Sequence, residues 1–314
     1  MKQLAHRIRE RVSNMLRSSR PSAQGASDGE MQTSGRFLSK DFKFESEIGR
    51  GFSGIIYKAS QVPSGKQVVV KSMKKDLIRK YDMNVDKEIE AHSRFCRADF
   101  VVNYFGCFEE NDTVYLVQEH CPGGDLFNFA CKRSKVSTTD VCFIICQVIA
   151  ALKEMHDAGF IHRDIKLENA LVTANGYLKL CDLGFAHCVE KHGRCYSEAG
   201  TRGYLAPEIL KKKGASYKSD IFSVGVMMFE LLNSAHPFRG KDDMETWFNT
   251  VKGRIISWTR CGRHNKLAES LMSGMLEPDE DKRLSIKEVM DHPYFAHVNW
   301  ECVRQRGYTS PLSP

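Results

Sequence analysis

The chain has 314 residues, 42% of them hydrophobic and 27% charged, which allows substantial buried cores and excludes a protein that is disordered throughout. Its formal net charge is +7, and most of this lies in residues 1–20, where six Lys or Arg stand against one acid. A nucleic-acid-binding domain would spread basic side chains over its folded part, so no nucleic-acid partner is expected.

The eleven cysteines are scattered without paired spacing, and residues 1–20 lack the apolar run of a secretory signal. The longest apolar stretches, 141–152 and 221–232, each contain a polar residue and fall short of a membrane span. We therefore expect reduced thiols and a cytoplasmic protein, with the nucleus or a peripheral place at membranes as alternatives. A monomer is expected.

In chain order, residues 1–41 predict a basic amphipathic arm followed by a flexible linker. Apolar residues recur at helical spacing among arginines between Leu4 and Leu16, whereas residues 18–35 are rich in Ser and Gly. Three roles stay open for residues 1–20: packing on the folded part or simple solvation, docking to a membrane or a partner, and a transit peptide.

From Phe42 onwards, short apolar runs alternate with turn signals, which indicates a small antiparallel sheet. One helix, over about 83–96, interrupts the strands, and after Gly124 the helical period dominates. The predicted class is α+β, with a mainly β N-lobe over 42–119, a mainly α C-lobe over 122–297 and a tail over 298–314. The strands are expected over 42–48, 55–60, 67–72, 103–108 and 113–118, and the later helices over 138–156, 218–232, 266–275 and 285–290.

A glycine-rich run lies between the first two predicted strands and reads Gly49-Arg50-Gly51-Phe52-Ser53-Gly54. Glycines let the backbone approach phosphate oxygens closely and offer them amide hydrogens. A dinucleotide-binding fold would need a helix directly after the last glycine. A strand is predicted there instead, so a loop over ATP fits better.

Lys71 follows the apolar strand residues 68–70, where a lysine is costly to bury unless an acid compensates its charge. Glu88, on the one helix predicted in this lobe, is the expected partner. Taken alone, either residue would more simply be a solvated surface charge. The motifs farther along the chain favour the pair.

The strongest signal is His162-Arg163-Asp164-Ile165-Lys166-Leu167-Glu168-Asn169, followed by Asp182-Leu183-Gly184 and then by Ala206-Pro207-Glu208. Together with the glycine run and Lys71, these motifs resemble those of the eukaryotic protein kinase family, in order, over roughly 42–298. The resemblance implies the bilobal protein kinase fold and an ATP- and Mg²⁺-dependent enzyme. At two positions, Lys166 and Thr201, the sequence resembles the serine/threonine branch of this family.

The resemblance also implies roles for single residues. Lys71 would hold the α and β phosphates while Glu88 orients it, Asp164 would accept the proton of the substrate hydroxyl, and Lys166 would neutralise charge on the transferring group. Asn169 and Asp182 would supply hard oxygen ligands for Mg²⁺. The ATP contacts expected from it are Ile48, residues 49–54, Ile56, Val69, Lys71, Gln118, Glu119, Cys121, Asp125, Glu168 and Leu171.

Substrate choice is inferred from three acids, Asp125, Glu168 and Glu230. They match positions where the cAMP-dependent kinase and its relatives recognise arginines before the phosphoacceptor, which implies protein substrates that are basic there and a role in intracellular signalling. The alternative is that they are ordinary surface acids. A tail beginning near Trp300 resembles the AGC group, with the calcium/calmodulin-dependent group as the rival.

In the activation segment, Ser197 aligns with the usual phosphosite, and Arg163 would receive its phosphate. An alternative hypothesis is that Glu198 partly stands in for the phosphate by pairing with Arg163. Two supports are also implied by the resemblance: Asp220 would brace the catalytic loop, and Arg283 would pair with Glu208.

Some positions depart from the family pattern. Gln118 stands where an apolar residue is usual at the back of the ATP pocket, and Leu183 replaces the commoner Phe. His92, Tyr104, Leu183 and His162 fall where the family packs its regulatory spine.

Two rival functions remain to be weighed. A scaffold that binds without turnover would lose Lys71, Asp164 or Asp182, and all three are present. A small-molecule kinase on the same fold would keep fewer of the later motifs, so Thr201 and residues 206–208 favour a protein substrate.

Overall fold

The computed structural model describes residues 37–51, 54–62, 64–96, 98–133, 136–189, 193–256 and 266–312. The arm predicted over residues 1–20, with Phe52 and Ser53 of the glycine run, lies outside these ranges. The chain divides into two compact units. Unit 1 consists of the described residues up to Ala98 together with Val102–His120, and unit 2 consists of Asp99–Val101 together with the described residues from Cys121 on.

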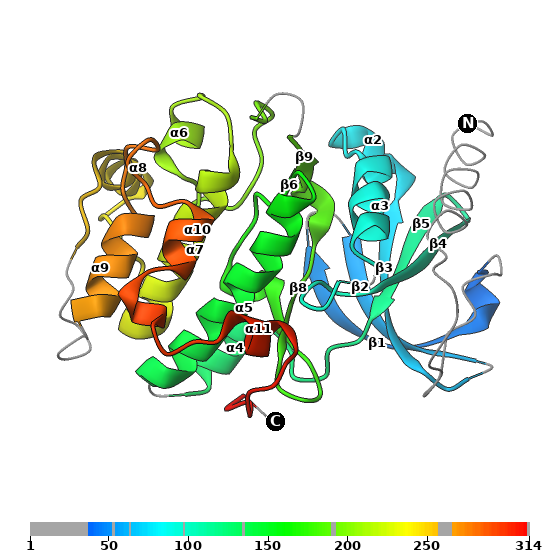
Figure 1. Ribbon diagram of the computed structural model, residues 1–314. Coiled ribbons are helices and arrows are strands. Elements are labelled where there is room, and N and C mark those ends of the chain that lie inside the picture. Colours follow the sequence, from blue (N-terminus) through cyan, green and yellow to red (C-terminus); the bar gives the residue numbers. More distant parts are fainter. Residues whose placement is uncertain are drawn as a thin grey trace. The chain divides into compact units, whose positions relative to one another are not determined.

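Unit 1 is a five-stranded antiparallel sheet in the order β1-β2-β3-β5-β4 (Figure 1). The five predicted strands are confirmed, with ends that differ by at most three residues. A short 3-10 turn, η1 (Ser39–Asp41), precedes them. The strands are β1 (Phe42–Gly51), β2 (Gly54–Gln61), β3 (Gln67–Lys74), β4 (Tyr104–Glu110) and β5 (Thr113–Glu119).

Unit 1 contains two helices between β3 and β4, whereas the sequence predicted one. The expected helix is α3 (Val85–Arg94), which begins where the side chain of Asn84 accepts a hydrogen bond from the Lys87 amide. The helix that was missed, α2 (Lys75–Lys80), has six residues. A helix of that length is too short to show an apolar period.

The two faces of the sheet have separate cores, because successive side chains of a strand point to opposite sides. Val68 and Val70 of β3 pack on one face with a cluster of aromatic side chains. On the other face, Met73 packs with Val85 and Ile89 of α3. Lys71 lies two residues before Met73 and so shares the face that α3 covers.

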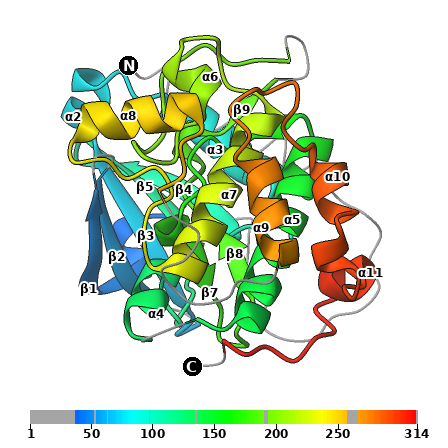
Figure 2. The same ribbon diagram turned by 90° about the vertical axis from the view of Figure 1, so that its left-hand side faces the viewer.

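Unit 2 is mainly helical and is built around α5 (Thr138–Asp157) and α7 (Tyr217–Asn233), which pack against each other. Both begin at a serine whose hydroxyl accepts a backbone hydrogen bond, and most of their residues are buried. Figure 2 shows α9 (Lys266–Met275) beside α7. The other helices are α4 (Leu126–Cys131), α6 (Pro207–Leu210), α8 (Asp243–Lys252), α10 (Ile286–Met290) and α11 (Trp300–Arg304), with 3-10 turns η2 (Leu167–Asn169), η3 (Leu183–Phe185) and η4 (Pro293–Phe295).

Two small sheets of unit 2 carry the loops that matter for function. β7 (Ala170–Val172) pairs with β8 (Leu178–Leu180), and β6 (Phe160–Ile161) pairs with β9 (His187–Cys188). Among the residues that the structure describes, no helix is long and apolar enough to cross a bilayer, and each cysteine is a free thiol.

The tail packs on unit 2 as far as Leu312, which is 1% exposed. The Ser310 hydroxyl donates to the Gly176 carbonyl at 2.7 Å. The Arg306 guanidinium lies 5.5 Å from the ring centre of Phe100 and donates to the Asp99 carbonyl. These contacts join the tail to Asp99–Val101, the three residues of unit 2 that lie in the sequence between the two stretches of unit 1.

Candidate active site

Gly51 ends β1 and Gly54 begins β2, and different constraints act on these two glycines. At Gly54, φ is +148°, and a Cβ would lie 2.1 Å from the Ser72 carbonyl oxygen of β3, so another residue cannot fit. At Gly51, a Cβ would meet no other described atom within 4 Å. Packing therefore fixes Gly54, whereas the backbone at Gly51 is open to an approaching ligand.

Lys71 and Glu88 form the buried ion pair that the sequence predicted. The Lys71 Nζ lies 2.7 Å from Glu88 Oε1, and the two residues are 5% and 3% exposed. β3 places the lysine, and the first turn of α3 places the acid. A buried cation whose acid holds it in one direction is suited to binding phosphate oxygens.

The remaining predicted residues of unit 1 lie on the strands around this pair. Val69, half-buried on β3, stands directly opposite Gln118 of β5. Ile48 is 50% exposed, and the exposed Arg50 pairs with Glu47 at 2.7 Å. At the end of β5, a carboxylate oxygen of Glu119 accepts a hydrogen bond from the Asn103 amide at 3.2 Å.

In unit 2, Asp164 is the centre of a network of short polar contacts. Its Oδ1 accepts a hydrogen bond from the Thr201 hydroxyl at 2.6 Å, and its Oδ2 lies 2.9 Å from the Lys166 Nζ. Lys166 also donates to the Thr201 hydroxyl at 2.7 Å. The Asn169 Nδ2 donates to Asp164 Oδ2 at 2.8 Å. A 2% exposed carboxylate held in this way can accept a proton at a fixed position.

Asn169 and Asp182 are brought to the same end of the β7–β8 hairpin. Ala170 stands opposite Leu180 in the register, and the Cys181 amide donates to the Asn169 carbonyl at 2.9 Å. Asp182 follows directly, in the left-handed region at φ +56°. Since Asn169 uses its amide nitrogen on Asp164, its Oδ1 is the atom suited to bind a cation.

This donor set fits Mg²⁺, because amide and carboxylate oxygens are hard ligands and proteins usually offer Mg²⁺ only one or two of them beside phosphate oxygens and water. Within the described ranges, no group of three or more His, Cys, Asp or Glu side chains is placed to hold a metal ion. Asn169 and Asp182 would therefore hold Mg²⁺ together with the phosphates.

The profile of the family described as "Protein kinase domain" matches residues 42–295. The chain belongs to the protein kinase family. It is 28% identical to the cAMP-dependent protein kinase catalytic subunit of Arthrobotrys oligospora over 95% of this chain and 58% of that protein. It is 30% identical to the protein of the same name from Dictyostelium discoideum over 88% of this chain and 43% of that one. Protein kinase C delta type of Mus musculus is 29% identical over 88% and 41%.

These relatives confirm the resemblance to serine/threonine kinases of the AGC group. The chain spans between about a third and three fifths of the length of the first relatives that it matches. The fold class predicted from the sequence, that of the protein kinases, is confirmed as well.

Asp220 braces the catalytic loop of the kinase, as predicted. Its two carboxylate oxygens accept hydrogen bonds from the amides of His162 and Arg163, both at 2.9 Å. Burial by itself would raise the pKa of Asp220, but the hydrogen bond with His156 at 2.9 Å and the hydrogen bond from the His162 amide keep that pKa below its usual value. An ionised carboxylate inside α7 therefore fixes the backbone on which Asp164 sits.

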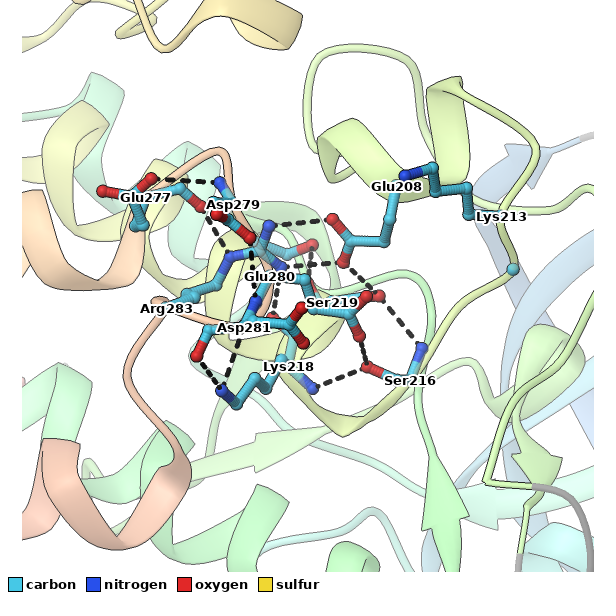
Figure 3. Close-up of polar contacts among 12 residues, drawn as sticks. Glu208, Lys213, Ser216, Lys218, Ser219, Glu277, Asp279, Glu280, Asp281 and Arg283 are labelled. Atoms are coloured by element: carbon cyan, nitrogen blue, oxygen red, sulfur yellow. Dashed lines mark hydrogen bonds and ion pairs between the residues drawn. The ribbon is translucent and has the colours of Figure 1, made fainter.

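The second predicted support, Arg283 with Glu208, is a bidentate pair with distances of 2.7 and 2.8 Å (Figure 3). Arg283 is 1% exposed, and Ser219 donates to the same carboxylate at 2.7 Å. Burial would raise the pKa of Glu208, and the hydrogen bonds from Arg283 lower it below the usual value. The pair ties the loop before α10 to α6.

Sequence reasoning missed an adjoining acid, Glu280. It accepts hydrogen bonds from Ser216 and, at 2.6 Å, from Arg194 of the activation segment. The Lys218 Nζ donates to its backbone carbonyl at 3.0 Å (Figure 3). Nothing in the acidic stretch 277–281 singles out Glu280, because its partners are 62 to 86 residues away in the chain.

In the activation segment, the structure shows a contact of Ser197 and corrects the expected partner of Glu198. Arg163 donates to the Ser197 hydroxyl at 3.0 Å, so the cation is already beside the predicted phosphosite. Glu198 does not pair with Arg163. It lies 3.4 Å from the Lys212 Nζ, and both side chains are largely exposed. Glu198 follows an exposed residue and points to solvent, where Lys212 is the nearer cation.

The three acids predicted for substrate binding all lie in unit 2 and have different surroundings. Both oxygens of Asp125 accept hydrogen bonds from Asn128 and so cap α4, and its backbone bridges to Leu171. Glu168 is exposed. Burial raises the pKa of Glu230 to about 7; a hydrogen bond from Tyr204 opposes this shift, and the charge of Glu168 adds to it.

Proposed function

We propose that the protein is an ATP- and Mg²⁺-dependent serine/threonine protein kinase. The observation that carries the proposal is the network in which Lys166, Thr201 and Asn169 converge on the buried Asp164. Phosphoryl transfer asks mainly for positioning and for neutralisation of charge, which is what these groups provide. The buried Lys71–Glu88 pair supports the same conclusion.

In the proposed reaction, Lys71 binds the α and β phosphates, and phosphate oxygens can approach the open backbone at Gly51. Asp164 orients the hydroxyl of the acceptor and takes its proton. Lys166 compensates the negative charge of the group in transfer while Thr201 keeps Lys166 and Asp164 aligned. Asn169 and Asp182 would hold Mg²⁺, which supplies further charge neutralisation at the phosphates when it is bound.

For the substrate, we extend the proposal to proteins with basic residues before the acceptor. Glu168 and Glu230 interact electrostatically, and the Asp125 backbone bridges to a strand that begins two residues after Glu168. A cluster of carboxylates attracts arginines and sets their register. Because its oxygens cap α4, Asp125 would contribute fixed negative charge more than a direct contact.

Several features of the wider protein stay proposals. These are the domain limits at 42 and 297, a monomeric state, a cytoplasmic location, a role in signalling without a nucleic-acid partner, and docking of a membrane or partner by residues 1–20. A salt-dependent liposome-binding measurement on the intact protein, with and without residues 1–20, tests the last of them.

The experiment for the main proposal is incubation with labelled ATP, Mg²⁺ and a degenerate serine/threonine peptide library. We expect label on serine or threonine, enriched in peptides with arginine before the acceptor. Asp164→Asn keeps the shape of the side chain and removes the base, so its rate should fall by about 100-fold or more. Wild-type protein that is folded and binds nucleotide but labels no peptide would instead support the hypothesis of a scaffold that binds without turnover. Label on small alcohols alone, when these are added to the assay, would support the hypothesis of a small-molecule kinase.

A further inference from the structure

The tail after α11 is held on unit 2 mainly through side chains, since residues 307–312 belong to no helix or strand. Tyr177 lies in the turn between β7 and β8 and is 4% exposed. The carbonyls of Arg306 and Tyr308 share the one proton of its hydroxyl. The Tyr308 hydroxyl in turn accepts a hydrogen bond from the Asn299 amide at 2.8 Å. One buried phenol thus gathers the start of the tail.

Ser310 is the next fixed point of the tail. Its hydroxyl donates to the Gly176 carbonyl at 2.7 Å and accepts a hydrogen bond from the Leu312 amide at 3.0 Å. Leu312 packs in the main core of unit 2. A serine hydroxyl has a single proton, and the tail uses it on the same turn that carries Tyr177. The position of the tail therefore depends on that proton.

Pro311 follows Ser310 directly. Proline has a fixed φ and no amide hydrogen, so an enzyme can select it with a site that would leave the amide of any other residue without a partner. Ser310 is half-buried, and a modifying enzyme can reach its hydroxyl only when the tail leaves the turn. A second Ser-Pro dipeptide, residues 313–314, lies outside the described residues.

We propose that Ser310 is a phosphorylation site for a proline-directed serine/threonine kinase, and that its phosphate releases the tail from the β7–β8 turn. In this reaction the Ser310 Oγ bonds to the γ-phosphorus of ATP, and the bond from that phosphorus to the β–γ bridging oxygen breaks, so that ADP leaves. The hydroxyl proton passes to the base of the modifying kinase. The ester oxygen can no longer donate to Gly176, whose carbonyl dipole then faces a negative charge.

The released turn is one end of the β7–β8 hairpin, and the other end carries Asn169 and Asp182. The Leu180 amide of this hairpin donates to the Phe100 carbonyl at 2.8 Å, and Arg306 of the tail lies over the Phe100 ring. Release of the tail thus removes contacts at the turn and beside β8. The expected loss of activity rests on the proposed kinase function, whereas the phosphorylation site does not.

The first test is incubation of the intact protein with ATP, Mg²⁺ and a proline-directed kinase, followed by location of the phosphate by mass spectrometry. An Asp164→Asn, Ser313→Ala background removes self-labelling and the second Ser-Pro. We expect phosphate on Ser310 and its loss in Ser310→Ala. Tyr177→Phe keeps the ring and loses the hydroxyl, so the tail opens more often and labelling of Ser310 should be about threefold faster or more. An unlabelled Ser310 would overturn the site, and an unchanged rate in Tyr177→Phe would overturn its protection by the turn.

The second test is hydrogen exchange of the phosphorylated protein, which needs no turnover. Peptides covering residues 176–180 and 306–312 should exchange about tenfold faster after phosphorylation than before it. Thr309→Glu is the matched control, because it adds a negative charge at an exposed neighbour and keeps the Ser310 hydroxyl; its exchange should stay within about twofold of wild type. Exchange that is unchanged or slower after phosphorylation would overturn the release.

Activity is measured on Ser313→Ala protein before and after phosphorylation, once the modifying kinase has been removed. Release of the hairpin should lower kcat/KM for ATP about threefold or more, with Thr309→Glu unaffected. An unchanged kcat/KM in protein whose exchange has risen would overturn the effect on the active site. Wild-type protein without any turnover would overturn the proposed function alone, because the label and the exchange are read without it.

Discussion

The two units hold their buried charged groups in different ways. In unit 1, a strand and a helix each supply one side of the Lys71–Glu88 pair, so the pair depends on where α3 lies on the sheet. In unit 2, the catalytic loop is bonded through its own backbone to the buried Asp220. The difference suggests that changes around α3 affect activity first, whereas changes in the buried ionic contacts of unit 2 affect stability first.

The largest expected effect is on the stability of unit 2. Arg283→Met leaves the buried Glu208 carboxylate without its cation, which should lower the free energy of unfolding by about 3–5 kcal/mol. Denaturant unfolding measures this change. Lys282→Met is the control, because Lys282 is exposed and lies 3.4 Å from Asp279; its effect should stay within about 0.5 kcal/mol.

The same variant also tests whether the Arg283–Glu208 pair contributes to stability rather than to activity. At a temperature where Arg283→Met is still folded, its kcat should stay within about threefold of wild type, because the pair acts on the framework of α6 and the loop before α10. A much larger loss of kcat in fully folded protein would show that the pair also sets the geometry at Asp164.

The next effect is expected in unit 1, on activity. Glu88→Gln removes the charge that orients Lys71, and kcat/KM for ATP should fall about 100-fold in protein that circular dichroism shows to be folded. Glu90→Gln on the exposed side of α3 is the control. Equal activities of these two variants would mean that Lys71 needs no oriented partner.

The sequence predicted the parts of the molecule that local patterns encode. Alternating runs gave the five strands of unit 1, helical periods gave α5 and α7, and the motif spacing located Lys71, Glu88 and the residues around Asp164. Contacts between distant residues without a motif were not predictable. Gln118 Nε2 lies 2.9 Å from His92 Nε2 although the two residues are 26 apart in the chain, and His92 was expected only at a position of the regulatory spine. Helix α2 was missed because six residues show no period.

A smaller effect is expected from the pH dependence of Glu230. Burial raises the pKa of this carboxyl to about 7, and an arginine of the substrate binds only its ionised form. KM for a peptide with arginine before the acceptor should therefore rise about tenfold as the pH falls from about 8 to 6, as for a single group of that pKa. A matched peptide without the arginine should show no such rise, and Glu230→Gln should flatten the profile.

The stability contribution of Glu230 follows from the same shift. Its pKa in the folded protein lies above the usual 4.5, so the folded state binds the proton more tightly than the unfolded state. The resulting stabilisation is fully present below pH 4.5 and is lost as the pH rises through about 7.

The KM measurement can also contradict the role of Glu230 in substrate binding. A KM for the arginine-containing peptide that stays the same between pH 8 and 6 would mean that the arginine binds elsewhere.

The smallest effect is expected at Glu198, in the segment that carries Ser197. Its partner is Lys212, and with side-chain exposures of 78% and 82% this pair is screened by solvent and contributes little. Glu198→Gln should therefore leave kcat within about twofold and the free energy of unfolding within about 0.5 kcal/mol.

Ser197→Ala removes the hydroxyl that Arg163 already contacts, and it should change kcat more than Glu198→Gln does. The reverse order would restore Glu198 as a substitute for phosphate, because its carboxylate would then have to leave Lys212 for Arg163 in the working enzyme.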